Sequence, residues 1–565
     1  MKSEGDIMRK TTFWKVMLVI AGCVLIFDSC IGGAKNSAPT GLKVPALAYD
    51  SSSAWLFWER PAKGERAAYY NIYANGKLLG TTKIPQSMVG TNHIQKFKVE
   101  NGALSGDLIA FHSYRAEGLQ PDTEYRFTVR AVDMNGLESA DSPVVSQRTT
   151  PVENVIKLTD FGAVGDGATV NTIVLQKAID ACPADGILEV PKGIFVTGAV
   201  QLKNNMTIQL DAGAVLLSAN AVDAYAMGSN NRYTGMLNAD GLSNIRIVGE
   251  GIIDGNGWQK DRTDHHYIKA NNKENKGVMD KAHVLNIGIL AKLQTQALMD
   301  EGLDFKNAYA SRSTTLLLHN VNNLYIEGVT LQNPAMHMLS TGGCNTVTLN
   351  NVKVMTYDCN NGDGIDFSGQ NLIVANSYFD TGDDAVNFSA GIGLKAASKP
   401  PVSGIWVFNT YFAHGHGAIV CGSHTGSWIQ DIVAEDNVME KTEIGLRCKT
   451  GQGIGGGARN ITFRNNVLKT MKHQAFIFTT AYTDANAVGS FEPSEAGQFR
   501  DIIIEDCNVD ATSGPAIEVD GIAEMPHKNI TFQNVHFTNV QLSKIQYLEN
   551  GVFDHVTYDG AADQK

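Results

Sequence analysis

The sequence is poor in features that would place a chain of this size in several familiar classes. Its eight cysteines include no Cys-x-x-Cys pair, which indicates buried thiols, with a disulfide allowed but not implied. Positive charge is also scarce, because 46 Lys and Arg stand against 58 Asp and Glu, a formal net charge of -12. This balance argues against nucleic acid as a partner, and an acidic polysaccharide would need a local basic patch to bind.

A long hydrophobic run is lacking as well, since the apolar stretch 16–27 is too short to cross a bilayer. Basic residues precede this stretch, which is typical of a secretory signal in residues 1–30. The segment resembles a bacterial lipoprotein signal, with Cys30 as the lipidated residue. Cys23 is an alternative lipidation site, and a cleaved signal with incidental cysteines is another interpretation. All of these interpretations predict that the protein is exported. It would reach the periplasm, or be a lipoprotein on the outer membrane or cell surface of a Gram-negative bacterium.

Residues 38–150 form a separate compositional unit that is rich in short apolar strands. The stretch Tyr70–Gly76 predicts a strand that runs into an Asn-Gly turn. The stretch Leu119–Tyr125 resembles the fibronectin type III pattern Leu-x-Pro-x-Thr-x-Tyr, in which the tyrosine makes the corner bond of a β-sandwich. An insertion is expected between Lys83 and Arg115. This unit carries no catalytic constellation, so we expect it to act as a spacer or docking module.

Residues 155–560 are predicted to form one further domain, which follows a short linker. Apolar residues at helical spacing over Asn171–Cys182 predict a helix that caps one end of this domain. From about residue 186 a frame recurs at intervals of roughly 20 to 40 residues, with apolar residues at +1, +3 and +8 from a small or polar starter. The starters are Asn244, Asn323, Thr346, Asn371, Gly404, Asn460, Asp501 and Asn529.

The repeated frame predicts an all-β fold. Alternation with period two places one face of each strand inward, so strands stacked coil on coil bury a continuous apolar tube. That arrangement is a right-handed parallel β-helix, whereas a β-sandwich would show hairpin turns that the frames lack. The predicted fold class is therefore a fibronectin type III-like β-sandwich followed by a right-handed parallel β-helix. The starter asparagines are expected to form turns and ladders rather than to bind ligands.

Carboxylates are concentrated within about one coil of this repeat. The stretches 361–367 and 380–386 contain five aspartates: Asp363, Asp366, Asp380, Asp383 and Asp384. Repulsion and desolvation make such a cluster unfavourable, but cleavage of a glycosidic bond requires a carboxylic acid and a carboxylate on opposite sides of the sugar. Because coils stack about 4.8 Å apart, Asp363, Asp383 and Asp384 are expected on one surface. Asp366 and Asp380 are expected to bond turn amides.

Four motifs occur in a fixed order around this cluster, and they resemble the signature motifs of glycoside hydrolase family 28, the polygalacturonase family. They are Asn361-Gly-Asp, Gly382-Asp-Asp, Gly415-His-Gly and Arg447-Cys-Lys. Gly362 and Cys448 stand where the family has Thr and Ile, and neither difference removes a charged group. The resemblance covers about 155–555, and the fibronectin-like unit resembles that of bacterial exo-acting members.

The resemblance implies roles for the acidic residues. Asp383 would be the general acid, and Asp363 and Asp384 would hold and deprotonate the attacking water. His416 would support the protonation of the acid. Since neighbouring carboxylates cannot all ionise freely, one is expected to keep its proton to higher pH. The family inverts configuration, so acid and base carboxyl groups are expected about 6.5–9.5 Å apart.

The resemblance also implies substrate contacts. Arg447 and Lys449 would bind a uronate carboxylate, because residues two apart on a strand share one face. His424 would contact either a sugar or the scaffold. Neither a metal ion nor another cofactor is expected.

The expected activity is that of an exo-acting polygalacturonase, which hydrolyses α-1,4-galacturonosyl linkages of pectin or polygalacturonate from a chain end. Long insertions at 259–311 and 482–499 are expected to wall off one end of the cleft, as exo action requires. Hydrolysis of rhamnogalacturonan or xylogalacturonan is an alternative within the same family. A calcium-dependent pectate lyase and a non-enzymatic glycan-binding β-helix are alternatives outside it.

Overall fold

The computed structural model describes residues 37–562, except for 62–65, 107, 229–230, 260–280, 357–358, 360, 484–490 and 560. The leader, with Cys23 and Cys30, lies outside the described residues, so its predicted export and lipidation stay predictions. Within the described ranges, no helix combines the length and the apolar character needed to span a membrane.

The N-terminal module is a sandwich of two antiparallel sheets. One sheet has the order β1-β2-β5 and the other the order β4-β3-β6-β7. Its strands are β1 (Thr40–Lys43), β2 (Ala54–Glu59), β3 (Tyr69–Ala74), β4 (Lys77–Thr81), β5 (Ser113–Ala116), β6 (Glu124–Val132) and β7 (Val145–Arg148). The insertion between β4 and β5 contains the helices α1 (Val89–Glu100) and α2 (Gly102–Ser105).

Two local predictions for this module are confirmed. Asn75 and Gly76 join β3 to β4 with φ of 51° and 76°, the left-handed conformation that an Asn-Gly hairpin turn requires. The hydroxyl of Tyr125 accepts a hydrogen bond of 2.9 Å from the backbone N–H of Gln120, which is the expected corner bond.

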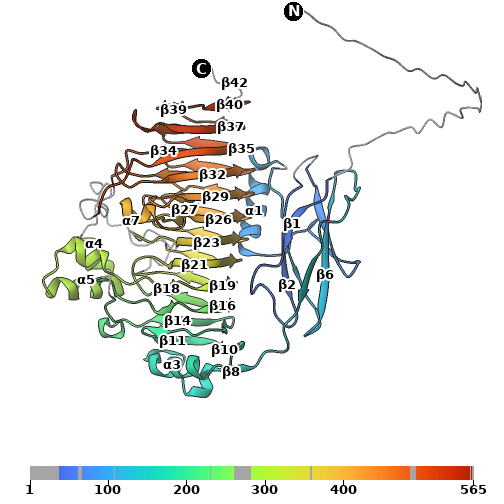
Figure 1. The fold of residues 1–565 in the computed structure, drawn as a ribbon. Coiled ribbons are helices and arrows are strands. Elements are labelled where there is room, and N and C mark those ends of the chain that lie inside the picture. Colours follow the sequence, from blue (N-terminus) through green and yellow to red (C-terminus); the bar gives the residue numbers. More distant parts are fainter. Residues whose placement is uncertain are drawn as a thin grey trace, which may run out of the picture. The chain divides into compact units, whose positions relative to one another are not determined.

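The second domain is a parallel β-helix, in which 35 described strands form one continuous sheet that folds around three faces (Figure 1). The first face contains β8 (Val155–Lys157), β10 (Gly186–Val190), β13 (Met206–Leu210), β16 (Ser243–Gly249), β19 (Asn322–Glu327), β26 (Val402–Phe408), β29 (Ile429–Glu435), β32 (Gly457–Arg464), β39 (Leu548–Glu549) and β40 (Val552–Asp554). The second face contains β9 (Asp166–Val170), β11 (Gly193–Thr197), β14 (Ala214–Ser218), β17 (Ile252–Asp254), β20 (Thr330–Gln332), β22 (Lys353–Met355), β24 (Tyr378–Asp380), β27 (Tyr411–His414), β30 (Val438–Glu440), β33 (Val467–Met471) and β41 (Thr557–Tyr558).

The third face carries the strands nearest the aspartate cluster. It contains β12 (Val200–Gln201), β15 (Leu237–Asp240), β18 (Leu316–His319), β25 (Val386–Phe388), β28 (Ile419–Cys421), β31 (Leu446–Lys449), β34 (Phe476–Thr479), β36 (Ile517–Asp520) and β38 (Lys544–Gln546). Four long strands turn a corner and belong to the third or second face as well as the first: β21 (Leu339–Asn350), β23 (Ile365–Ala375), β35 (Gln498–Thr512) and β37 (His527–Thr538). A last strand, β42 (Ala561–Ala562), pairs antiparallel with β41.

Equivalent positions of the recurring sequence frame pair with one another in successive coils of this β-helix. The starters adopt left-handed backbone, for example Asn323 and Asn371 with φ of 64° and 62°. Their side chains form ladders between coils, such as the 2.8 Å bond from Asn323 Nδ2 to Asn244 Oδ1. Asn tolerates this backbone better than most residues, and its amide both donates and accepts. The interpretation of the starters as turn-forming ladder residues is confirmed.

The interior is filled by the apolar positions of the frame. The residues at +1 are buried and lie in one register: Ile245, Leu324, Val347, Leu372, Ile405, Ile461, Ile502 and Ile530. The cysteines of the described part, from Cys182 to Cys507, are free and buried, as predicted.

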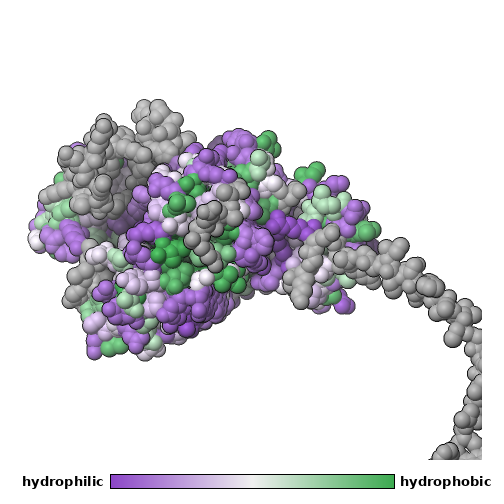
Figure 2. Space-filling model, turned by 90° about the horizontal axis from the view of Figure 1, so that it is seen from above, coloured by the Kyte–Doolittle hydropathy of each residue, from purple (hydrophilic) through white to green (hydrophobic). Residues whose placement is uncertain are grey.

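The two ends of the stack differ. Helix α3 (Thr172–Ala181) packs Leu175, Ala178 and Ile179 into the core at the first coils, so the predicted cap is confirmed (Figure 1). At the opposite end Leu542 and Val552 are exposed, and Figure 2 shows hydrophobic residues in the centre of this view of the molecule.

The module lies along the β-helix, which supports the docking interpretation rather than that of a spacer. Strand β2 is buried on both sides, because Leu56 and Trp58 face the core of the module while Trp55 and Phe57 pack against the β-helix residues Trp406 and Phe408. In the insertion, Ile94 and Phe97 of α1 pack against the second face, in a cluster with Val438 and Val467. The insertion therefore lets the module contact two faces.

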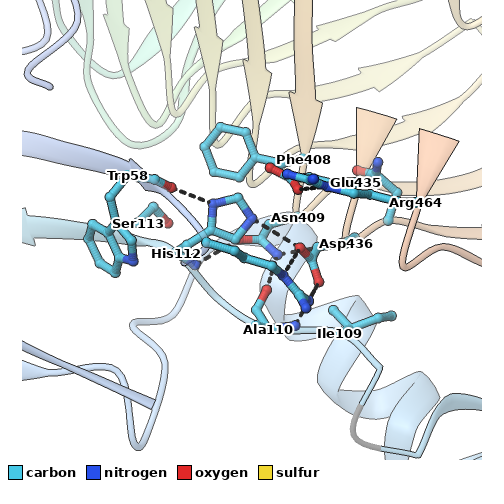
Figure 3. A network of polar contacts seen from close by, with 12 residues as sticks. Trp58, Ile109, Ala110, His112, Ser113, Phe408, Asn409, Glu435, Asp436 and Arg464 are labelled. Carbon is cyan, nitrogen blue, oxygen red and sulfur yellow. Dashed lines mark hydrogen bonds and ion pairs between the residues drawn. The ribbon is translucent and has the colours of Figure 1, made fainter. Parts of the chain in front are cut away.

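A buried ionic network joins the two domains at Asp436 (Figure 3). The Nε of Arg60 donates to Asp436 Oδ2 over 2.8 Å, and Nε2 of His112 lies 3.2 Å from the same oxygen. The other ring nitrogen of His112 lies 2.9 Å from the carbonyl of Trp58. Both nitrogens of His112 therefore face oxygen atoms, one from each domain.

Candidate active site

The three aspartates predicted to cooperate lie in turns that connect the second face to the third. Asp363 precedes β23, and Asp383 and Asp384 precede β25, one coil further along. The backbone N–H of Gly364 donates to the carbonyl of Asp384 over 3.0 Å, which stacks the two turns directly. One oxygen of each carboxyl group lies within 4.8 Å of an oxygen of the other two. The structure thus gathers all three carboxylates on one surface. The expected separation of about 6.5–9.5 Å between acid and base is wrong for this site, because the stacked turns bring the nearest oxygens within 4.8 Å.

Two cations hold the innermost of these carboxylates. Arg447 Nη1 lies 2.9 Å from Asp384 Oδ1, and Lys449 Nζ lies 2.7 Å from Asp384 Oδ2. Both come from β31 and share one face, as their spacing predicted, and both contact Asp384, while Lys449 also lines the cleft over the carboxylates. Burial opposes their charge, yet Asp384 raises the pKa of both. The ring of Tyr482 lies 5.8 Å from the guanidinium and 5.0 Å from the ammonium.

Asp383 forms a second pair with His416. The Nδ1 of His416 lies 2.9 Å from Asp383 Oδ1, and the N–H of Asn361 donates to Asp383 Oδ2 over 3.1 Å. Asp383 raises the pKa of His416 to about 9 against the opposing effect of burial. Burial alone would raise the pKa of Asp383, but His416 and the more distant Lys449 hold it well below its ordinary value. The pair therefore keeps one proton up to high pH, carried by the imidazole.

Asp363 is the aspartate that keeps its own proton to higher pH. Burial raises its pKa to about 8, and the charges of Asp366 and Asp383 act in the same direction. His337 opposes them, since its Nδ1 lies 3.1 Å from Asp363 Oδ1 and 3.3 Å from Asp366 Oδ2. The prediction that one of the three aspartates is held protonated is confirmed, and the structure assigns it to Asp363 rather than to the implied acid Asp383.

His337 is a site residue that sequence reasoning missed. It occupies the register position of Asp363 one coil earlier, because Leu339 of β21 pairs with Ile365 of β23. Burial would lower its pKa, but Asp366 and Asp363 raise it to about 9. The signal in the sequence is a single histidine 26 residues before Asp363, which has meaning only when the length of the coil is known.

The interpretation of Asp366 and Asp380 as bonding turn amides is wrong. Asp366 lies on β23, where its Oδ1 accepts a 2.8 Å bond from Asn387 and its Oδ2 faces His337. Asp380 ends β24 and lies 2.9 Å from Nδ1 of His414. Both side chains project from strand residues rather than turn positions, so their partners come from neighbouring coils.

A cleft of about 410 Å³ lies over the carboxylates. Its lining includes the three aspartates, Lys449 and the predicted sugar contact His424, together with four groups that were not predicted: Arg232, Arg312, His337 and Tyr482. Arg312 is fully buried, and it donates to the carbonyls of Tyr309 and Ala335. The cleft therefore combines acids at its centre with cations on both sides. The converging carboxylate oxygens could hold a cation, but Arg447 and Lys449 already occupy Asp384.

The described part of the first insertion borders one end of this cleft. It forms α4 (Lys281–Ile287), α5 (Leu290–Asp300) and α6 (Phe305–Ala310). Leu290 and Leu298 of α5 pack with Tyr309 of α6 and with Tyr233, whose side chain lines the cleft. Tyr482, which opens the second insertion, lines the cleft near Lys449.

Comparison with known proteins decides the family. The sequence profile of glycosyl hydrolases family 28 matches residues 294–553, and that of the fibronectin type III domain matches residues 37–148. The chain is 38% identical to the exo-poly-alpha-D-galacturonosidase of Dickeya chrysanthemi, over 96% of this chain and 93% of that protein. The chain belongs to glycosyl hydrolases family 28. The resemblance inferred from its four motifs is therefore confirmed, and the protein is a glycoside hydrolase.

One solved structure of a family 28 member shares nearly the whole architecture, and a second solved structure shares the fold over part of the chain. The exopolygalacturonase of Yersinia enterocolitica superposes with a TM-score of 0.87 at 38% identity, over 94% of this chain and 97% of that one. A hyperthermoactive exopolygalacturonase from Thermotoga maritima, 20% identical, shares the fold with a TM-score of 0.56 over 71% of this chain and 92% of that one.

Replacing Asp363 by Asn is expected to stabilise the fold at pH 8 by about 0.5–2 kcal/mol, as neutralising substitutions at active sites commonly do. A pKa raised to about 8 means that the folded state holds this proton more tightly than the unfolded chain, so ionisation of Asp363 costs stability that grows as pH rises towards 8. The gain should be small near pH 4, where Asp363 is protonated in the folded state and about half protonated in the unfolded chain. Melting temperatures of both proteins at pH 4 and pH 8 test this, and a variant less stable than wild type at pH 8 would contradict it.

Proposed function

We propose that this family 28 enzyme is an exo-acting polygalacturonase, which hydrolyses α-1,4-galacturonosyl linkages of polygalacturonate from a chain end with inversion of configuration. The observation that carries the proposal is the convergence of three carboxylates beside two cations, in a cleft bordered at one end by the helical insertion. The cations give an acidic protein the local positive charge that a uronate needs. The two full-length relatives, both named as exo-acting enzymes, support the same activity.

The proposed reaction begins with proton transfer to the leaving oxygen from Asp383. The pair with His416 supplies that proton, because Nδ1–H of the imidazolium points at the Asp383 carboxylate over 2.9 Å. Protonation of the leaving group lets the bond to the anomeric carbon break as water attacks from the opposite side.

The attacking water is proposed to lie between Asp363 and Asp384, whose carboxylates stack in successive coils. Asp384, whose two oxygens accept from Arg447 and Lys449, is proposed to take the proton that the water loses as it attacks. We assign these two cations a second partner, the carboxylate of a galacturonate at the cleaved bond, with His424 as a further sugar contact at the cleft wall.

Product analysis tests the exo proposal. Polygalacturonate digested with wild-type enzyme is expected to release one short product from the earliest time points, with slow loss of viscosity. Proton NMR of the first products should show the β-anomer, since inversion of an α-linkage gives it. A ladder of intermediate oligomers with a rapid fall in viscosity would contradict exo action.

We also propose that the enzyme is exported. A lipid on Cys30 of the leader would anchor it to a membrane of a Gram-negative envelope. The support for this proposal is the basic, apolar and cysteine-ending pattern of residues 1–30. Metabolic labelling with a fatty acid should mark the wild type and not the variant Cys30→Ser. Labelling that persists in that variant and disappears with Cys23→Ser would move the site to Cys23.

A further inference from the structure

Arg312 is a fully buried arginine beneath the cleft, and its guanidinium joins three segments of the site. Its Nε donates to the carbonyl of Tyr309 over 2.6 Å, near the end of helix α6, and its Nη1 donates to the carbonyl of Ala335 over 2.5 Å. Its Nη2 donates to Oδ1 of Asn361 over 3.3 Å, two residues before Asp363. A guanidinium holds its N–H groups in fixed directions, so this one side chain sets the three segments relative to one another.

Aromatic rings of the first insertion and its surroundings fix the position of Arg312. Its guanidinium lies 3.3 Å from the centroid of the Tyr309 ring and 5.8 Å from that of Trp258. Both rings belong to the cluster that packs α5 and α6 onto the β-helix. Because a cation over an aromatic face is attracted to it, these rings hold the guanidinium in place. The insertion thus does more than border the cleft, since it holds a side chain that reaches a catalytic turn.

Asn361 connects Arg312 to Asp383. Its φ of 59° is left-handed, a conformation that Asn tolerates, and its backbone N–H donates to Asp383 Oδ2 over 3.1 Å. The other oxygen of Asp383 lies 2.9 Å from Nδ1 of His416. Both oxygens of this carboxyl group are therefore held by donors. A change in the orientation of the Asn361 peptide would release one side of it.

We propose that Arg312 is a positioning residue for the hydrolysis. It acts through Asn361, whose peptide it holds in the orientation that fixes the carboxyl group of Asp383 for proton transfer to the leaving oxygen. This inference rests on the proposed role of Asp383 as the general acid, and it requires no contact between Arg312 and the sugar. Its loss should lower kcat and leave KM nearly unchanged, because the orientation of an acid matters in the transition state rather than in substrate binding.

A double-mutant cycle tests the connection through Asn361. Arg312→Lys keeps a positive charge but loses the planar fork, and Asn361→Gly keeps the left-handed backbone and its N–H but removes the acceptor Oδ1. Each variant is expected to lower kcat on polygalacturonate about 10- to 100-fold, with KM within a few-fold of wild type. The double variant should be no slower than the slower of the two. Losses that multiply would overturn the proposal.

The ionisation of His416 gives a second readout, which needs no substrate. Asp383 raises the pKa of His416 to about 9, and Glu443 and Asp384 also face this ring. A weaker N–H bond to the Asp383 carboxylate makes that carboxylate more basic, so the pKa of His416 should rise by about one unit in both single variants. Titration of the protein with ¹³C-labelled histidine by NMR measures it, with His416→Gln to assign the signal. An unchanged pKa in both variants would contradict the proposal.

Gln294→Met is the matched control. Gln294 of α5 is fully buried, and its Oε1 accepts bonds from the backbone N–H and the hydroxyl of Ser313 over 2.9 and 3.2 Å. This variant loosens the same insertion but leaves the bonds of Arg312 to Asn361 in place. It should lower the melting temperature, with kcat and the pKa of His416 close to wild type.

The outcomes separate this inference from the proposed function. If Gln294→Met lowers kcat and shifts the pKa of His416 as much as Arg312→Lys does, Arg312 only supports the fold and the inference is overturned. If wild type releases no sugar from polygalacturonate, the proposed function fails, while the pKa comparison still decides whether Arg312 acts on Asp383.

Discussion

Asp383→Asn is expected to lower kcat on polygalacturonate by about 10²- to 10⁴-fold, the usual contribution of a general acid. The amide keeps the shape of the side chain and its contact with His416, but it cannot take up the proton of the imidazolium and pass it to the leaving oxygen. KM should stay close to the wild-type value, because Arg447 and Lys449 are untouched. Initial rates of reducing-sugar release, measured over a range of substrate concentrations, check both parameters.

The matched control for this variant is Asp380→Asn. Asp380 is the last residue of β24, the strand that leads into the turn containing Asp383. Its carboxylate pairs with His414, and Asp380 is not among the residues that line the cleft. Its replacement should leave kcat within a few-fold of wild type. Equal loss in both variants would mean that the turn had been damaged, and wild-type rates in Asp383→Asn would refute its role as the acid.

Arg60→Gln is expected to lower the free energy of unfolding by about 3–5 kcal/mol, because it leaves a buried carboxylate without its main partner. Asp436 is fully buried, and besides Arg60 it contacts His112 and the N–H of Ala110 (Figure 3). The module packs on two faces of the β-helix, so both domains should respond together. Thermal and denaturant unfolding of the whole chain measure the change.

Arg148→Gln provides the comparison for that prediction. Arg148 and Asp122 form an ion pair of 2.8 Å on the surface of the module, with more than half of each side chain exposed. Water screens such a pair, so the melting temperature should hardly change. A comparable loss in both variants, or no loss in Arg60→Gln, would show that the interface does not depend on the buried pair.

The β-helix could be predicted from the sequence because its information is local and repeated. Each coil needs a residue that tolerates left-handed backbone, here usually Asn, followed by apolar residues at alternate positions. The convergence of the aspartate motifs could be predicted for the same reason, since the turn that precedes each strand of the third face stacks on the turn before it. The fold, the helical cap and the convergence of the three aspartates followed from spacing, whereas the roles assigned to the aspartates came from the resemblance to the family.

Contacts between coils depend on the lengths of the loops, which the repeated sequence frame does not determine. Only the tertiary structure showed which side chains meet. His337 reaches Asp363 because of the register between β21 and β23, and Arg232 reaches the cleft because Tyr233 is anchored to an irregular insertion. The protonation of the site also depends on tertiary contacts. Burial raises the pKa of Asp363 and the charge of Asp383 raises that of His416, whereas His416 lowers the pKa of Asp383. Composition and spacing therefore determined that the three aspartates meet at the site, while the electrostatics of their packing decided what each of them can do.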